Sequence, residues 1–103
     1  MAKTTERLSA LKVKNIKGPG YFSDGGNLYF RIAQGGSRGW IFRYTMHGRA
    51  RDMGLGAYPE ISLADARELA GKYRVLVKQG VDPIEQRRTA RARERVSVEA
   101  GPS

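Results

Sequence analysis

Arginine side chains are concentrated in one short stretch of the sequence, RYTMHGRARDMGLG, which runs from Arg43 to Gly56. Three arginines lie there, on both sides of a His-Gly pair. A guanidinium group offers a planar set of donors that fits a phosphate, or the guanine edge in the major groove of DNA. The stretch therefore points to nucleic-acid binding, provided that the fold brings these arginines to one surface.

The overall charge agrees with a polyanionic partner but does not identify one. The chain has 19 basic and 10 acidic side chains, a formal net charge of +9 and a pI near 10.4. The excess lies mainly in the residues up to Ala57, where ten basic side chains face only three acidic ones. Ribosomal, DNA-binding and membrane-surface proteins all carry such charge, so its position matters more than its size.

Other classes of site are disfavoured by composition. The chain has no cysteine and one histidine, which excludes a disulfide framework, a thiolate metal site and a histidine cluster. No run of about 18 apolar residues is present, and the first residues lack the apolar segment of a signal peptide. We therefore expect a soluble cytoplasmic protein of one small domain, with no metal, cofactor, membrane or small-molecule partner.

Two stretches alternate between apolar and polar residues, as half-buried strands do. They are residues 28–33 and 40–46. The inward face is predicted to carry Leu28, Phe30, Ile32, Trp40, Phe42, Tyr44 and Met46, and the outward face Tyr29, Arg31, Ala33, Ile41, Arg43 and Thr45.

The His47-Gly48 pair predicts a two-residue type I′ turn, because glycine accepts a positive φ and histidine tolerates one. This turn fixes the register of a third strand. The predicted pairs are Met46 with Arg49, Thr45 with Ala50, Tyr44 with Arg51, Arg43 with Asp52, Phe42 with Met53 and Trp40 with Leu55. In this register Arg43 meets an acid, and Arg51 is expected to lie along the Tyr44 ring.

Helix signals follow the third strand. Ser62 is a candidate N-cap, an apolar stripe continues from Leu63 to Val77, and Gly80 is the expected stop. A shorter helix is expected from Ser9 to Ile16, with Leu8, Leu11 and Ile16 turned inward. Tyr21-Phe22 is expected to pair at most as a brief edge strand.

The sequence thus predicts an α+β fold. It consists of a three-stranded antiparallel sheet with one main α-helix on one face, a short N-terminal helix and a basic C-terminal tail. The expected domain spans residues 1–80. Residues 81–103 are expected to form a basic linker, in which Asp82-Pro83 starts a solvated helical segment too poor in apolar residues to bury anything.

The uncovered face of this sheet is the candidate binding surface. It would carry Tyr29, Arg31, Arg43 and Thr45, and the hairpin tip would add His47, Arg49 and Arg51. The major groove admits a narrow β-ribbon or sheet, and arginine in it contacts both guanine and phosphates. An ordinary alternative is that the face is polar only because water covers it.

Three segments together resemble the amino-terminal domain of prophage- and genomic-island-type tyrosine integrases. They are SDGGNLYFRI, SRGWIFRYTMHGRARDMGLGAYPEISLADAR and QGVDP, which occur here in the order typical of that family. The resemblance runs from about Leu11 to Pro83. It implies a small α+β module that sets a three-stranded sheet into the major groove at arm-type DNA sites, with other integrase protomers as possible partners.

The resemblance also implies a division of labour. The catalytic Arg, Lys, His-x-x-Arg and Tyr set of the family has no counterpart here, since His47 is followed by Gly-Arg-Ala. We therefore expect no catalytic residue and no enzymatic activity in this chain, while a parent protein would be a tyrosine recombinase found at the bacterial nucleoid when bound. Asp52 stands where the family commonly has a neutral or basic residue, which favours Arg31 over Arg43 as a base reader.

Two other functions remain open at this point. A single-stranded RNA or ribosome-associated protein would use Tyr29 to stack on bases. A protein-interaction module for integrase assembly would use the sheet edge or the arginine run from Arg87 to Arg95.

Overall fold

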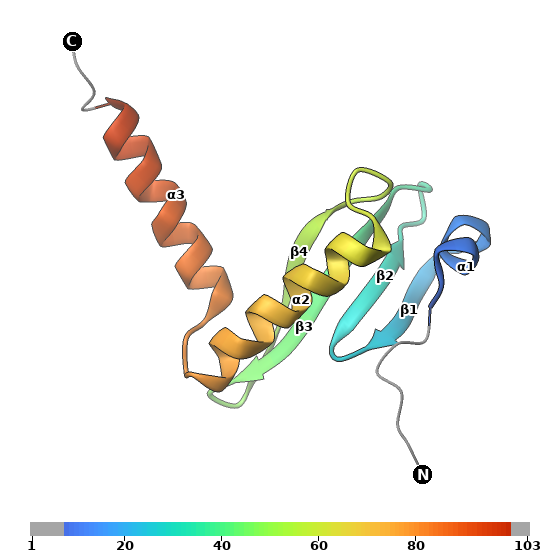
Figure 1. Cartoon of the computed structure of the whole chain (residues 1–103), viewed down its shortest axis with the longest axis horizontal. Coiled ribbons are helices and arrows are strands. Elements are labelled where there is room, and N and C mark those ends of the chain that lie inside the picture. The colour runs from blue at the N-terminus through green and yellow to red at the C-terminus, as the bar shows by residue number, and fades with distance from the viewer. Residues whose placement is uncertain (1–7, 100–103) are drawn as a thin grey trace.

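The computed structural model describes residues 8–99 of the chain, and the side chains of residues 8–94. Seven elements follow one another (Figure 1). They are α1 (Ala10–Asn15), β1 (Gly20–Gly25), β2 (Leu28–Ile32), β3 (Arg38–Met46), β4 (Arg49–Ala57), α2 (Leu63–Lys78) and α3 (Pro83–Glu99). The predicted α+β class is confirmed.

The sheet has four antiparallel strands in the order β1-β2-β3-β4, so the prediction of three strands is wrong. The additional strand grows from the expected Tyr21-Phe22 pair and extends to Gly25. Gly26 and Asn27, with φ of 59° and 69°, form the reversal into β2, because both residue types accept the left-handed region. α2 crosses one face of the sheet, and within the described residues no helix covers the other face (Figure 1).

The hairpin between β3 and β4 forms around the predicted turn. His47 and Gly48 have φ of 54° and 75°, as a type I′ turn requires. The five predicted pairs nearest the turn, from Met46-Arg49 to Phe42-Met53, are confirmed. The sixth is wrong: a bulge between Trp40 and Ile41 places Trp40 opposite Gly56, because β4 carries one extra residue there.

The core lies between the sheet and α2. All seven side chains predicted to point inward from β2 and β3 are buried, including the large rings of Phe30, Trp40 and Phe42. The indole Nε1 of Trp40 donates to the Ile61 carbonyl at 2.7 Å, which satisfies the one polar atom of that ring. This bond fixes the loop that leads from β4 into α2.

α2 begins and ends where the sequence predicts. The Ser62 side chain accepts a hydrogen bond from the Asp65 amide at 3.1 Å, and Gly80 follows the helix with φ of 80°. Leu63, Ala66 and Ala70 are its buried residues. The small side chains of Ala66 and Ala70 let the helix lie close to this face of the sheet.

α1 buries a different residue from the one expected. Leu11 is 70% exposed, whereas Val13 is fully buried and Leu8 nearly so. Residues two apart lie on opposite sides of a helix. Because Val13 points toward the core, Leu11 points toward solvent. Ile16 is half-buried against the core, as predicted.

A buried ion pair joins the N-terminal segment, β1 and α2. Asp24 is 2% exposed, and its carboxylate accepts two hydrogen bonds from Arg67, both at 2.9 Å, and one from the Leu8 amide at 2.9 Å. Arg67 also donates to the Leu8 carbonyl at 2.7 Å. This network explains why β1 is a full strand of the sheet.

α3 leads away from the rest of the molecule (Figure 1). Asp82 caps it by accepting from the Ile84 amide at 3.0 Å, and Pro83 occupies the first helical position, as predicted. Pro83 is buried and Ile84 packs against the core, so the expectation that this segment buries nothing is wrong for its first turn. None of the helices in the described part of the chain is long and apolar enough to span a membrane.

Candidate nucleic-acid interface

Strand pairing places the four predicted sheet residues on one uncovered face. Tyr29 pairs with Ile41 across β2 and β3, and Arg43 and Thr45 follow Ile41 at alternate positions. Arg31, Arg43 and Thr45 are exposed, and Tyr29 is half-buried. We call this side, with Tyr21 of β1, the open face.

Tyr21 is the member of the open face that the sequence prediction missed. It pairs with Arg31 in the register of β1 and β2, and its side chain is 50% exposed. The guanidinium carbons of Arg31 and Arg43 lie 5.7 and 5.5 Å from the centre of its ring. Arg43 also lies 5.2 Å from the centre of the Tyr29 ring. The two arginines are therefore held beside two aromatic rings, within the range of cation–π attraction.

Arg43 is also bound to the acid that faces it. Its Nε and Nη2 atoms donate to the two Asp52 carboxylate oxygens at 2.8 and 3.2 Å. The bond from Arg43 holds the pKa of Asp52 below its ordinary value, and the same bond raises the pKa of Arg43. Both side chains are about 44% exposed. Two of the guanidinium nitrogens of Arg43 are therefore already bound to Asp52. Arg31, in contrast, makes no ion pair with any described residue.

The open face is flat beside Ile41. Gly39 and Gly54 flank this residue on β3 and β4, where no side chain rises from the sheet. Together with Arg31, Arg38 and Ile41 they line a shallow hollow. Because Gly39 and Gly54 have no side chains, another molecule can approach the backbone here, next to Arg31 and Arg38.

Two of the three residues predicted at the hairpin tip, His47 and Arg49, lie at different positions on it. His47 is exposed at the turn. Arg49 is exposed too, but it pairs with the buried Met46, so it leaves the sheet on the side of α2. Both are at one end of the sheet, and only His47 is at the turn itself.

Arg51 is engaged within the protein. Its Nη1 atom donates to Asp82 at 2.9 Å and to Glu85 at 3.3 Å, and these bonds raise its pKa. The expected stacking on Tyr44 is replaced by these ion pairs, since the Tyr44 hydroxyl donates to the same Asp82 carboxylate. No local sequence pattern indicates this link, because Asp82 lies 31 residues away from Arg51.

Burial and hydrogen bonds at this junction also shift the pKa values of Tyr44 and Asp82. Burial, followed by the hydrogen bond to Asp82, raises the pKa of Tyr44 to about 12. Partial burial acts to raise the pKa of Asp82, but hydrogen bonds from Tyr44, Arg51 and the Ile84 amide bring it below the ordinary value. We call Tyr44, Arg51, Asp82 and Glu85 the α3 junction.

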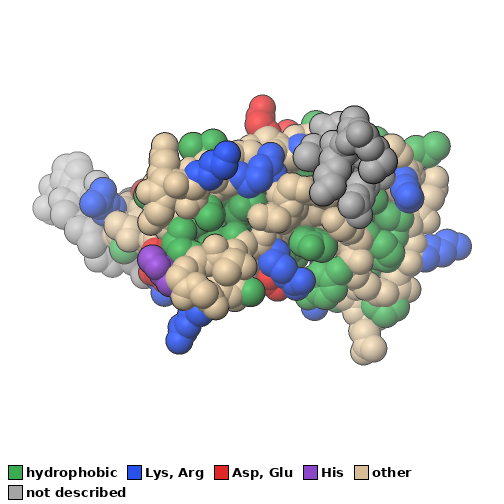
Figure 2. Space-filling view, turned by 90° about the horizontal axis from the view of Figure 1, so that it is seen from below, with side chains coloured by type: hydrophobic (Ala, Val, Ile, Leu, Met, Phe, Trp, Pro, Cys, Tyr) green, Lys and Arg blue, Asp and Glu red, His purple; other side chains and the backbone are tan. Residues whose placement is uncertain are grey.

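On the side of the molecule seen from below, basic groups lie apart from one another with few acids between them (Figure 2). In the part of the chain that the structure describes, no three His, Cys, Asp or Glu side chains are grouped as metal ligands. The arrangement suits attraction of a polyanion.

Comparison with known proteins agrees with this surface. The chain is 35% identical over 74 residues to prophage integrase IntZ of Escherichia coli (strain K12), over 72% of this chain and 18% of that protein. It is 33% identical over 93 residues to prophage integrase IntA of the same strain, over 85% of this chain and 22% of that protein. The integrase of Shigella phage Sf6 is 29% identical over 87 residues, which cover 84% of this chain and 22% of that protein.

The chain therefore spans less than a quarter of the length of these integrases. The model of a protein family described as "Arm DNA-binding domain" matches residues 8–90. This range contains the whole sheet, α2 and the first turns of α3. Because the match covers most of the sequence, the chain belongs to the family of Arm DNA-binding domains.

Proposed function

We propose that this domain binds double-stranded DNA sequence-selectively by setting its open face into the major groove. The observation that carries the proposal is the joint placement of Arg31 and Arg43 on an uncovered sheet face, beside the rings of Tyr21 and Tyr29. The major groove is about 12 Å wide, and narrow β-ribbons and sheets are known to enter it.

The proposed contacts differ in strength. Arg31 is the best candidate to read a base, since its donors are not used by an acid in the described structure. Arg43 is a weaker candidate, because part of its guanidinium group is bound to Asp52. Thr45 and Tyr29 each offer one hydroxyl group for hydrogen bonding. His47 and Arg49 at the tip would meet phosphates at the border of the groove, and such contacts fix register without reading sequence. Arg51 adds positive charge while it remains bound to Asp82.

We further propose that the domain serves as the N-terminal module of an integrase of the tyrosine recombinase class. The named integrases support this, since this chain corresponds to about a fifth of each. Strand cutting and joining would belong to other parts of such a protein. This domain would bring the integrase to its arm-type sites, where other protomers would assemble on the same DNA.

Competition between nucleic acids tests the proposal. We expect a labelled duplex, selected by the chain from a random-sequence pool, to be displaced by unlabelled duplex of the same sequence and poorly by single-stranded DNA or RNA. Log affinity should fall with log salt by about 0.9 for each phosphate neutralised. Fluorescence anisotropy over a salt series measures both properties.

The alternatives give different results in the same assay. Preferential displacement by single strands would favour a stacking surface built on Tyr29. Duplex binding that is absent or independent of salt would refute the proposed function.

A further inference from the structure

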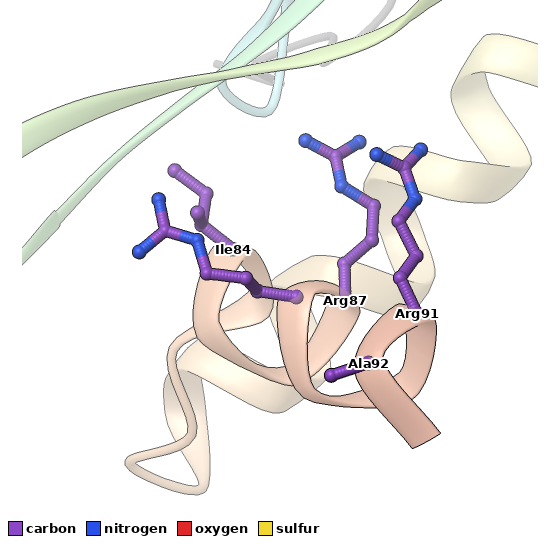
Figure 3. Close-up of a pocket in the computed structure, with 5 residues that line it drawn as sticks. Ile84, Arg87, Arg91 and Ala92 are labelled. Carbon is purple, nitrogen blue, oxygen red and sulfur yellow. The ribbon is translucent and has the colours of Figure 1, made fainter. Parts of the chain in front are cut away.

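The first three turns of α3 carry arginines on one side. Ile84, Arg87, Arg88 and Arg91 recur at three- and four-residue spacings, which places them on the same face of the helix. A pocket lies between them, bordered also by Ala92 (Figure 3). We call Arg87, Arg88 and Arg91 the α3 arginine face.

The first turn fixes the direction of this face. Ile84 packs against the core, and Arg87 Nη1 donates to the Gly54 carbonyl of β4 at 2.7 Å. Figure 3 shows Arg87 and Arg91 extending in parallel from successive turns of α3. The arginine face is thus turned toward the edge of the sheet, whereas Arg93 lies about 200° around the helix from Arg91.

The α3 arginine face also adjoins the open face. Gly54, which Arg87 contacts, pairs with Ile41 of β3. Gly54 and Ile41 line the shallow hollow that Arg31 borders. Cationic groups therefore continue from the open face around the β4 edge and onto α3.

The donors of this face are available to a ligand. The Arg88 side chain is 70% exposed, and only its Nη1 atom lies near an acid, 3.5 Å from Glu85 Oε2. Its other guanidinium donors are open to a ligand. Arg91 is exposed, and within the described part of the chain it makes no hydrogen bond or ion pair. Arg87 and Arg91 are one turn apart, about 6 Å along the helix axis. Such a row of guanidinium groups suits a row of phosphates, which accept paired hydrogen bonds.

We propose that the α3 arginine face binds the sugar-phosphate backbone of the duplex whose groove the open face enters. This inference rests on the proposed function and adds a second contact to it. The contact is to phosphates because α3 leads away from the sheet (Figure 1), outside the groove that the open face would occupy. It increases affinity for every sequence equally.

A pair of matched substitutions in the full chain tests the inference. Arg91→Gln and Arg93→Gln each remove one exposed arginine from the same helix, but only the first alters the α3 arginine face. We expect Arg91→Gln to weaken binding roughly five- to tenfold at 0.1 M salt, and to reduce the salt slope by about 0.9. The loss should be equal for the selected duplex and for an unrelated one, and Arg93→Gln should leave the slope unchanged. Circular dichroism checks that both variants keep their helices.

The outcomes separate this inference from the proposed function. Equal slopes for Arg91→Gln, Arg93→Gln and the unsubstituted chain would overturn it, and would leave an acidic protein surface as the partner of this face. In that case duplex binding and its dependence on Arg31 would persist. Absence of duplex binding by the unsubstituted chain would refute both.

Discussion

At the scale of single residues, Tyr21 has a clear physical role on the open face. Two guanidinium carbons lie within 6 Å of its ring centre, and the pairing of β1 with β2 places it directly beside Arg31. A long arginine side chain loses conformational entropy when it binds, and a neighbouring ring reduces that loss by limiting its positions beforehand. In the proposed complex, Tyr21 would therefore hold the two arginines in position for contact with DNA.

This role predicts a difference between two substitutions. Tyr21→Ala should weaken duplex binding about two- to fivefold, the range expected for an exposed cation–π contact. Tyr21→Phe should bind as the unsubstituted chain does, because it keeps the ring. Anisotropy titrations of both variants measure the effect. An equal loss in Tyr21→Phe would show instead that the hydroxyl contacts the DNA.

Residue patterns predicted the outward position of Arg31, Arg43 and Thr45 because a strand alternates its side chains strictly. They did not assign Tyr21 to the open face, because the turn-rich residues on both sides of Tyr21-Phe22 indicated at most a brief edge strand. The stabilising contact of that strand is the Asp24–Arg67 ion pair, whose partners are 43 residues apart. No local pattern carries such a contact.

At the scale of elements, the α3 junction connects the hairpin to the start of α3. Tyr44 of β3 and Arg51 of β4 both donate to Asp82, which itself caps α3. The carboxylate thus binds three donors from three parts of the chain. Ionisation of Tyr44 would place a second negative charge beside Asp82 and remove one of these donors.

The raised pKa of Tyr44 predicts a loss of stability in alkali. Its value in the folded chain is about 12, against an ordinary value of 10.0, so the folded state favours the neutral phenol. The stabilisation is complete below pH 10 and is lost as the pH rises through about 12. Two pKa units correspond to roughly 2 to 3 kcal/mol.

Urea unfolding of the chain and of Tyr44→Phe measures this contribution. The difference in unfolding free energy between the two should shrink from pH 8 to pH 12, since only the unsubstituted chain can ionise at this position. Other tyrosines and the lysines titrate in both proteins and cancel in the difference. A difference that stays constant with pH would contradict the role given to Tyr44.

The elements were predictable to different degrees. The β3–β4 turn and α2 follow from local signals, namely His47-Gly48, the Ser62 cap and Gly80. The bulge opposite Trp40 was not predictable, because an extra residue in a strand changes no local pattern and Gly56 fits it through its φ of 140°. The packing of Ile84 on the core depends on the long-range α3 junction.

At the scale of the whole molecule, the proposed DNA contact rests on the difference between the two sides of the sheet. α2 covers one side through Leu63, Ala66 and Ala70, and on the other side arginines and two tyrosine rings remain accessible to solvent. Net charge attracts DNA from a distance, but only groups on a shared surface can enter one groove. The family match assigns DNA binding to the domain, and the arrangement of side chains points to the face.

The most direct test compares one cation on each side of the sheet. Arg31 lies on the open face and Lys72 is exposed on α2, so Arg31→Gln and Lys72→Gln remove equal charge from opposite sides. Affinity for the selected duplex and for an unrelated one should be measured for both variants at one salt concentration. We predict that Arg31→Gln loses about 1 to 3 kcal/mol of binding to the selected duplex together with part of its selectivity, while Lys72→Gln stays within about twofold of the unsubstituted chain. Equal losses from both variants, or a larger loss from Lys72→Gln, would contradict the placement of DNA on the open face.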